Sequence, residues 1–189
     1  HCRKLRVKNP ILTNEELGKI RDISTGAFKT KEIAVLFDAC AGETGFISVV
    51  KEICTQAEEA IEKGCSFLIL SDRGTDENTI ALPMLLALSA VHQHLIQCGL
   101  RSQAGLVVES AEPREVHHFA LLFGYGADCI NPYLAYRAIS YLEEQKQISL
   151  DYEKAVKNYR KAVTDGILKI LSKMGISTLR SYRGAQIFE

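Results

Sequence analysis

The sequence predicts an α/β fold in which βα repeats build a mostly parallel sheet. Residues 105–136 change twice from an apolar run to helical spacing, which is the pattern of strand, helix, strand and helix. Two earlier apolar runs, at 31–37 and 66–70, are each followed by a helical stretch. Such connections join parallel strands through right-handed crossovers. Four units of this kind make either a half barrel related to the TIM barrel or one side of an open sheet, and spacing alone does not distinguish the two.

The N-terminal part of the chain reads as a segment that leads into the sheet. Residues 1–8 are basic with weakly alternating apolar positions, which predicts an arm or an edge strand. Thr13 and Glu16 have the spacing of a capping box, so a short helix is expected to run to about residue 23. Residues 24–28 are expected to form a loop.

The first predicted strand, at 31–37, is rich in Ile, Val and Leu and ends at Asp38. A glycine-containing turn then leads into a predicted helix at 46–63, whose apolar residues recur at helical spacing. Gly64 follows this helix directly. Because helices often end in a left-handed residue that is usually glycine, Gly64 is the expected C-cap.

The middle of the chain repeats the same alternation. A second strand is predicted at 66–70 and is followed by a polar loop at 71–76. A long apolar helix then runs from Pro83 to residue 97. The third strand, at 105–109, is apolar without alternation, as expected for a strand buried on both faces.

The last third of the chain is predicted to be mainly helical. Pro113 suits the first turn of a helix, where its missing N–H costs nothing. The remaining predicted elements follow in order: a fourth strand at 128–130, a helix at 133–142, a polar linker at 143–149, a long helix at 152–174, an extended piece at 176–179 and a new helix near residue 183.

Composition excludes several classes of protein. Lys and Arg together number 23, and so do Asp and Glu, so no general attraction to nucleic acid or to membrane surfaces is expected. No apolar run approaches the roughly 20 residues of a membrane helix. The six cysteines contain no CxxC pair, which favours free thiols in a reducing compartment. The chain begins at His1 without Met, and we interpret it as a fragment.

Polar side chains follow the predicted strands where each strand ends, and functional groups of parallel α/β folds gather at that rim. The rim candidates are Asp72, Arg73, Glu109 and Asn131. One interpretation is a polar binding or catalytic site. The other is loop capping and ion pairing, for example between Asp72 and Arg73 or a neighbouring Arg, because helix N-termini require such acceptors.

No metal site is predicted. His92 and His94 point to different sides of their helix, and the adjacent His117 and His118 also diverge. His94 and Cys98 have i, i+4 spacing and could face one ion, but two ligands without a third do not make a site. The glycines around Tyr125 lack the third glycine of a dinucleotide-binding loop and predict a tight connection instead.

Several long motifs resemble those of one family. They are LILSDRGTD at 68–76, LPMLLALSAVHQHLI at 82–96, VVES at 107–110, REVHHFALL at 114–122, GYGA at 124–127 and INPYLA at 130–135. In this order they resemble the large subunit of glutamate synthase, in its central domain running into the start of the FMN-binding domain. Gln93 and Pro113 depart mildly from the family pattern.

The resemblance implies an enzyme that makes two glutamates from glutamine, 2-oxoglutarate and two electrons. Its amidotransferase domain releases ammonia, and its FMN domain, which carries a 3Fe-4S cluster, reduces the imine. The central domain links the two domains and helps to form the ammonia route. Residues 1–30 would be a lead-in, 31–150 the central α/β domain, and 151–189 a connecting helix with the start of the FMN-binding domain. Ferredoxin or an NAD(P)H-dependent small subunit would supply electrons, in bacterial cytoplasm or plastid.

The same resemblance implies that this piece is inactive alone and binds no cofactor tightly. Cys2 cannot act as an N-terminal nucleophile because His1 precedes it. We expect no catalytic residue in the chain. Gly175 and Ser177 are candidates for contact with FMN at the domain edge, with helix capping as the alternative. Two other functions remain open: an independent barrel-type enzyme using the four rim residues, and a pure subunit-contact module.

Overall fold

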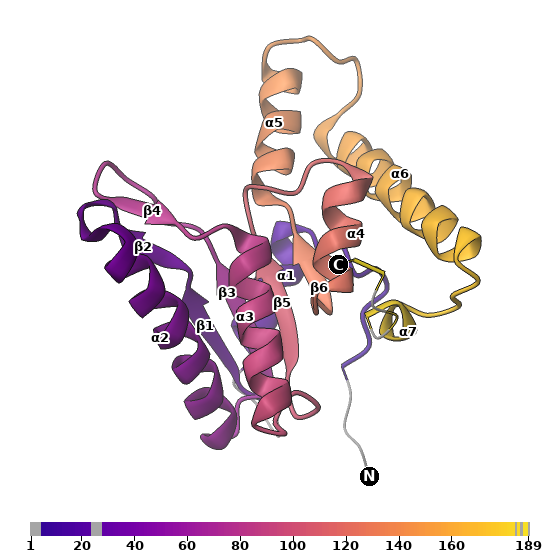
Figure 1. The fold of residues 1–189 in the computed structure, drawn as a ribbon. Coiled ribbons are helices and arrows are strands. Elements are labelled where there is room, and N and C mark those ends of the chain that lie inside the picture. The colour runs from indigo at the N-terminus through magenta and orange to yellow at the C-terminus, as the bar shows by residue number, and fades with distance from the viewer. Residues whose placement is uncertain (1–4, 24–27, 184, 186, 189) are drawn as a thin grey trace.

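Four parallel strands form the central sheet in a computed structural model that describes residues 5–23, 28–183, 185 and 187–188. In spatial order they are β1 (Thr30–Ala34), β3 (Phe67–Ser71), β5 (Gly105–Glu109) and β6 (Cys129–Asn131) (Figure 1). The strands pair in register, so that they all end at one edge of the sheet. Helices connect successive strands of this sheet, and the predicted α/β fold with a mostly parallel sheet is confirmed.

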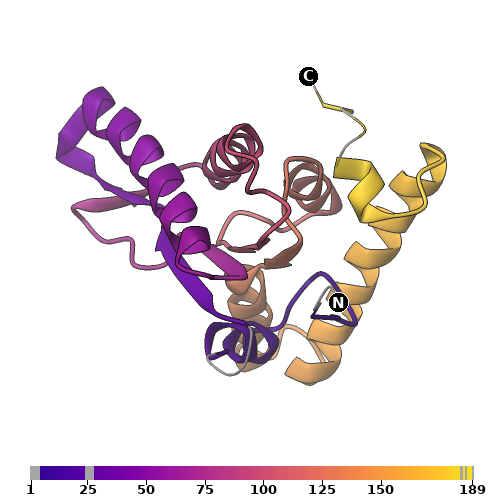
Figure 2. The ribbon, with the colours of Figure 1, turned by 90° about the horizontal axis from the view of Figure 1, so that it is seen from below.

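Helices cover both faces of this sheet. On one face lie α2 (Gly42–Glu62), α3 (Met84–Gln97) and α4 (Val116–Gly124), and on the other lies α1 (Asn14–Arg21) (Figure 2). The side chains of each strand alternate between these two layers. Leu70 belongs to the core under α2–α4, whereas its neighbour Ile69 packs with Leu17 of α1. Burial on both faces explains the apolar runs in the sequence, and each such side chain contributes about 1.5–3 kcal/mol.

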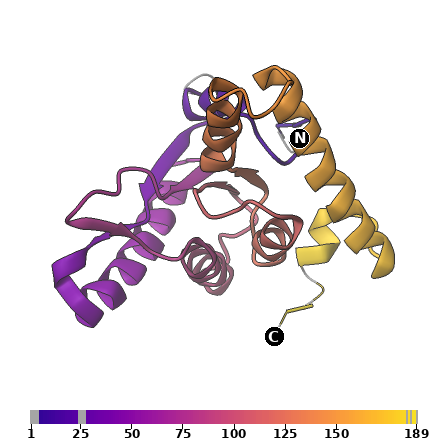
Figure 3. The same ribbon diagram turned by 90° about the horizontal axis from the view of Figure 1, so that it is seen from above.

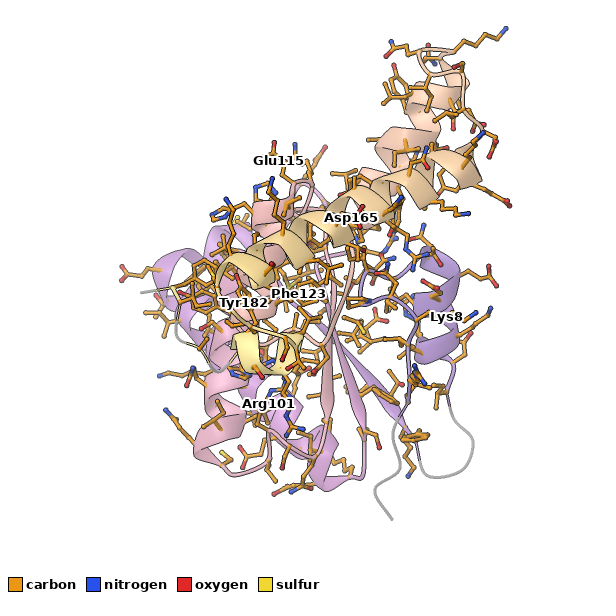
Figure 4. The ribbon with its side chains drawn as sticks, turned by 90° about the vertical axis from the view of Figure 1, so that its right-hand side faces the viewer. Lys8, Arg101, Glu115, Phe123, Asp165 and Tyr182 are labelled. Carbon is orange, nitrogen blue, oxygen red and sulfur yellow. The ribbon has the colours of Figure 1, made fainter. Side chains whose placement is uncertain are left out.

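Three helices complete the chain: α5 (Tyr133–Glu144), α6 (Tyr152–Lys173) and α7 (Leu179–Arg183). Asp151 caps α6 by accepting a hydrogen bond from the N–H of Lys154 at 2.8 Å. Helix α6 packs against α5 (Figure 3) and against α4. From α7, Tyr182 reaches the main core beside α4 (Figure 4). The C-terminal helices are therefore part of the same core as the sheet.

The prediction of a single strand at 31–37 is wrong at its C-terminal end. The structure divides it into β1 and a separate β2 (Leu36–Asp38), which pairs antiparallel with β4 (Thr79–Ala81). Between β1 and β2, Val35 donates its N–H to Ser71 O and accepts from Leu82 N, so the chain leaves the main sheet at this residue. The pattern did not predict β4, because three residues are too few to show a period.

Other boundaries differ by a few residues. A 3₁₀ turn, η1 (Ala39–Ala41), directly precedes α2, and α2 begins at Gly42 instead of residue 46. At its start Asp38 accepts a hydrogen bond from Cys40 N at 2.8 Å. Residues 5–8 form no strand, while 1–4 and 24–27, where the rest of the arm and most of a loop were predicted, lie outside the described residues.

The outer edge of β6 is covered by the segment that precedes α1. Ile11 makes a parallel bridge with Ile130, the middle residue of β6. Ile130 donates its N–H to Pro10 O and accepts from Leu12 N, both at 2.8 Å. Within the described residues, no helix has the length and apolar character that crossing a membrane requires.

Candidate functional site

The structure brings the rim candidates together at the carboxyl edge of the sheet. Ser71, Glu109 and Asn131 are aligned as the last residues of β3, β5 and β6. They have the same position in the strand alternation as Ile69 and Val107, so their side chains lie on the face that α1 covers. Asp72 follows directly after β3. The edge therefore holds three polar side chains in a row, all of them buried.

Glu109 is the centre of this rim. Its side chain is 2% exposed, and it accepts hydrogen bonds from Ser71 Oγ at 2.6 Å, Arg73 Nε at 2.6 Å and Arg21 Nη2 at 2.7 Å. Arg21 also binds Glu32 of β1 through Nε at 2.6 Å. A buried carboxylate is tolerated only when it is paired and hydrogen-bonded, and this one has both kinds of partner. Glu109 thus joins α1 to the sheet.

Asp72 does not form the ion pair that its sequence neighbour Arg73 suggested. Its carboxylate accepts from Ser110 Oγ at 2.6 Å and from Ala111 N at 2.9 Å, which fixes the loop after β5. The suggested ion pair of Asp72 with Arg73 is wrong, because Arg73 pairs with Glu109. Loop capping, the other part of that interpretation, describes the bonds of Asp72.

A cavity opens beside Arg73. The Arg73 guanidinium lies 3.9 Å from the centre of the Tyr133 ring, a cation–π contact. Burial, with the nearby charge of Asp72, raises the pKa of Tyr133 to about 12. The cavity has a volume of about 400 Å³. It is lined by Asn14, Arg73, Tyr133, Leu134, Tyr136, Arg137, Ser140 and Tyr152.

Asn131 ties the N-terminal segment to the rim. Its Nδ2 donates to Leu12 O and to Asn14 Oδ1, each at 3.0 Å, and Tyr136 donates its hydroxyl to the same Leu12 carbonyl. Its Oδ1 is buried without a hydrogen-bond partner. Each rim candidate therefore has a structural contact within the chain, and the arrangement holds α1 and the strand ends in one position.

The opposite end of the sheet holds a second charged cluster. Asp128 binds Arg101, Arg183 of α7 and the N–H of Leu106. Arg101, labelled next to α7 in Figure 4, also donates from Nε to His92 Nδ1 at 2.8 Å. Burial, together with the positive charges of Arg101 and Arg183, lowers the pKa of His92 to about 4. His92 is therefore a neutral acceptor at pH 7.

The residues expected near FMN show the geometry of a helix end. Gly175 has φ of +68°, and its N–H and that of Ile176 bond back to Ser172 O and Leu171 O. A side chain added at Gly175 would meet nothing within 4 Å, so no close surface surrounds it. Ser177 is exposed. These features fit a helix C-cap and do not form a flavin-binding surface. Contact of Gly175 and Ser177 with an FMN that is held by another part of a larger protein stays a prediction.

The described cysteines do not fit a 3Fe-4S cluster. Such a cluster needs thiolates that converge on it. Among the described residues, the one group of three metal-ligating side chains whose ligand atoms lie within 4.8 Å of one another is Glu58, His94 and Cys98. Cys98 and His94 are the pair whose i, i+4 spacing lacked a third ligand in the sequence. Glu58, on the neighbouring helix α2, stands in that third position.

Fold and rim together define a half-barrel α/β domain whose strand-end carboxylates are bonded within the chain. In fold it is similar to DHODH from Eimeria tenella, solved in complex with ferulenol, a TIM-barrel type of structure, with a TM-score of 0.50 and 14% identity, covering 74% of this chain and 36% of that one. The family model described as glutamate synthase central domain matches residues 1–189. The chain belongs to the glutamate synthase central domain family, and the predicted membership is confirmed.

The relatives in this family depend on different electron donors. The chain is 49% identical over 189 residues to glutamate synthase [NADPH] large chain of Bacillus subtilis, covering 100% of this chain and 12% of the relative. It is 42% identical over 192 residues to glutamate synthase [NADH] of Schizosaccharomyces pombe, covering 100% and 9%. It is 40% identical over 196 residues to ferredoxin-dependent glutamate synthase 2, chloroplastic, of Arabidopsis thaliana, covering 97% and 12%. The chain spans 12% or less of each of these three relatives.

Proposed function

We propose that this domain is the rigid spacer of a glutamate synthase, linking the amidotransferase domain to the FMN domain and helping to form the ammonia route between them. The observation that carries the proposal is the bonding of the rim. Glu109 and Asp72 would be the natural general acids or bases at the carboxyl edge of the sheet, but they bind Arg21, Arg73, Ser71, Ser110 and the Ala111 N–H. Because both carboxylates are occupied by these bonds, they support a structural role for the rim and not a catalytic one.

The chemistry of the parent enzyme gives the spacer its purpose. Free ammonia is protonated to ammonium in neutral water and is then lost as a nucleophile, so a protected path of fixed length favours its transfer. A sheet with helices on both faces suits this task, because packed interiors deform little. FMN and a 3Fe-4S cluster would supply the redox chemistry from outside this chain. The electrons for the parent enzyme would come from ferredoxin or from NADPH or NADH, as the names of the relatives suggest.

The proposal is tested by the coupling of the two reactions in the full-length enzyme. Glu109→Gln removes the charge that joins α1 to β5, while Glu32→Gln removes the exposed partner of the same Arg21. We expect Glu109→Gln to raise the glutamine consumed per 2-oxoglutarate consumed, with flavin reduction by the electron donor unchanged. The matched Glu32→Gln enzyme keeps the wild-type ratio. A wild-type ratio in a folded Glu109→Gln enzyme would refute the spacer role, and loss of subunit assembly at that ratio would support a contact module.

The isolated 189-residue chain provides a second test. We expect it neither to hydrolyse glutamine nor to form a stoichiometric flavin complex. Glutaminase turnover or a bound flavin would overturn the proposal. A small anion that stabilises the chain through the cavity at Arg73 would instead favour the rim as an enzyme site, and Arg73→Gln would then abolish that stabilisation.

A further inference from the structure

We propose that Glu58, His94 and Cys98 form a zinc site that clamps α2 to α3 on the outer layer of the half barrel. Helices α2 and α3 lie side by side against the same face of the sheet (Figure 1). His94 and Cys98 are one turn apart at the end of α3, and Glu58 reaches them from the last part of α2. The site is remote from the rim and involves none of its residues.

The distances fit a three-ligand site with a small adjustment. His94 Nε2 lies 3.7 Å from Cys98 Sγ and 2.7 Å from Glu58 Oε2. Zn–S bonds of about 2.3 Å and Zn–N or Zn–O bonds of about 2.0–2.2 Å in a tetrahedron place ligand atoms roughly 3.4–3.6 Å apart. At 3.7 Å the sulfur and the imidazole nitrogen are only slightly farther apart than this. Glu58 must withdraw by less than 1 Å, roughly, to reach it, and its partly exposed side chain leaves room for the movement.

The hydrogen bond between Glu58 and His94 explains why the ligands are assembled without an ion. When His94 Nε2 carries a proton, it donates a hydrogen bond to the Glu58 carboxylate, and this bond holds both side chains in place across two helices. Metal binding at Nε2 leaves the neutral imidazole with its one proton on Nδ1, whereas the thiol proton of Cys98 is replaced by the cation. The thiol proton passes to solvent, because Cys98 is exposed.

The donor set and its surroundings select the class of ion. A thiolate with an imidazole favours zinc over magnesium or calcium, which prefer all-oxygen ligands. Three protein ligands leave the fourth tetrahedral position to water. Cys98 is the C-cap of α3 and Glu62 is the last residue of α2, so the partial negative charge of both helix ends and the carboxylate of Glu62 favour a cation here.

Cobalt(II) is the probe that tests this site, because its spectrum reports both thiolate ligation and coordination number. We expect the reduced, metal-free and untagged 189-residue chain to bind one equivalent of Co²⁺. The complex should show a thiolate-to-cobalt charge-transfer band and the intense visible bands of a four-coordinate ion. Added Zn²⁺ should bleach these bands and raise the thermal midpoint of unfolding.

Variants assign the ligands. Cys98→Ala and His94→Gln should each weaken binding by more than about tenfold, and Cys98→Ala should abolish the charge-transfer band. Glu58→Gln should also weaken binding. Cys40→Ala, which removes an exposed cysteine from η1, is the matched control and should bind as the wild type does. A wild-type chain without the charge-transfer band, weak six-coordinate bands alone, or an unchanged spectrum in a folded Cys98→Ala chain would each overturn the proposal.

Discussion

The contact between α4 and α6 depends on one glycine. A Cβ placed on Gly166 of α6 would lie 2.5 Å from Cγ2 and 2.8 Å from Cγ1 of Val116, in the first turn of α4. Because both methyl groups are too close, rotation of Val116 about its Cα–Cβ bond does not clear the space. Helix α6 crosses α4 at this end of the domain (Figure 4). We predict that Gly166→Ala forces the two helices apart.

The magnitude follows from two opposing effects. Overpacking costs about 1–3 kcal/mol, and two contacts this short place Gly166→Ala near the upper value. Alanine recovers about 1 kcal/mol of helix propensity. The net loss is about 2 kcal/mol, which lowers the midpoint of thermal unfolding by roughly 4–8 °C in a chain of this size.

Urea unfolding followed by far-ultraviolet circular dichroism measures this loss. The matched control is Gly18→Ala in α1, where an added Cβ meets nothing within 4 Å. That variant should gain roughly 0.4–1 kcal/mol. The double variant Val116→Ala/Gly166→Ala should recover stability relative to the sum of the single changes, by about 0.5–3 kcal/mol. A Gly166→Ala chain as stable as the wild type, or strict additivity in the double variant, would refute the close-contact argument.

Two further predictions concern charges. Glu109→Gln should lower the free energy of unfolding by about 2–4 kcal/mol, because it leaves two guanidinium groups without their buried partner. Glu32→Gln, which removes an exposed ion pair, should lower it by less than about 1 kcal/mol. Equal losses for the two variants in urea unfolding would contradict the role given to Glu109. His92 has its pKa lowered from 6.5 to about 4, so between these pH values the unfolded chain binds a proton that the folded chain does not. The free energy of unfolding should therefore fall as pH decreases through this window, by about 2–3 kcal/mol in total. The His92→Gln variant should lose less stability over the same window. If stability depended on pH in the same way in the wild type and in His92→Gln, the result would argue against a buried neutral histidine.

The sequence predicted those parts of the molecule that have a local signal. Strands buried on both faces appear as apolar runs, and the rule that parallel strands end together was enough to find Asp72, Glu109 and Asn131 on one rim. Pairs that are distant in sequence had no such signal. On the rim, Arg21 lies 88 residues from Glu109, and in the separate cluster between α2 and α3, Glu58 lies 36 residues from His94. A single sequence carries no pattern for pairs that only the crossovers bring together.

The covered edge of β6 also bears on how such a domain can be enlarged. Both backbone groups of Ile130, at the middle of the strand, are already committed to Pro10 and Leu12. A duplicated copy could not add its first strand there and complete an eight-stranded ring unless the peptide before α1 were displaced first. Protein engineers who wish to fuse two of these halves into a closed cylinder should begin by deleting that peptide.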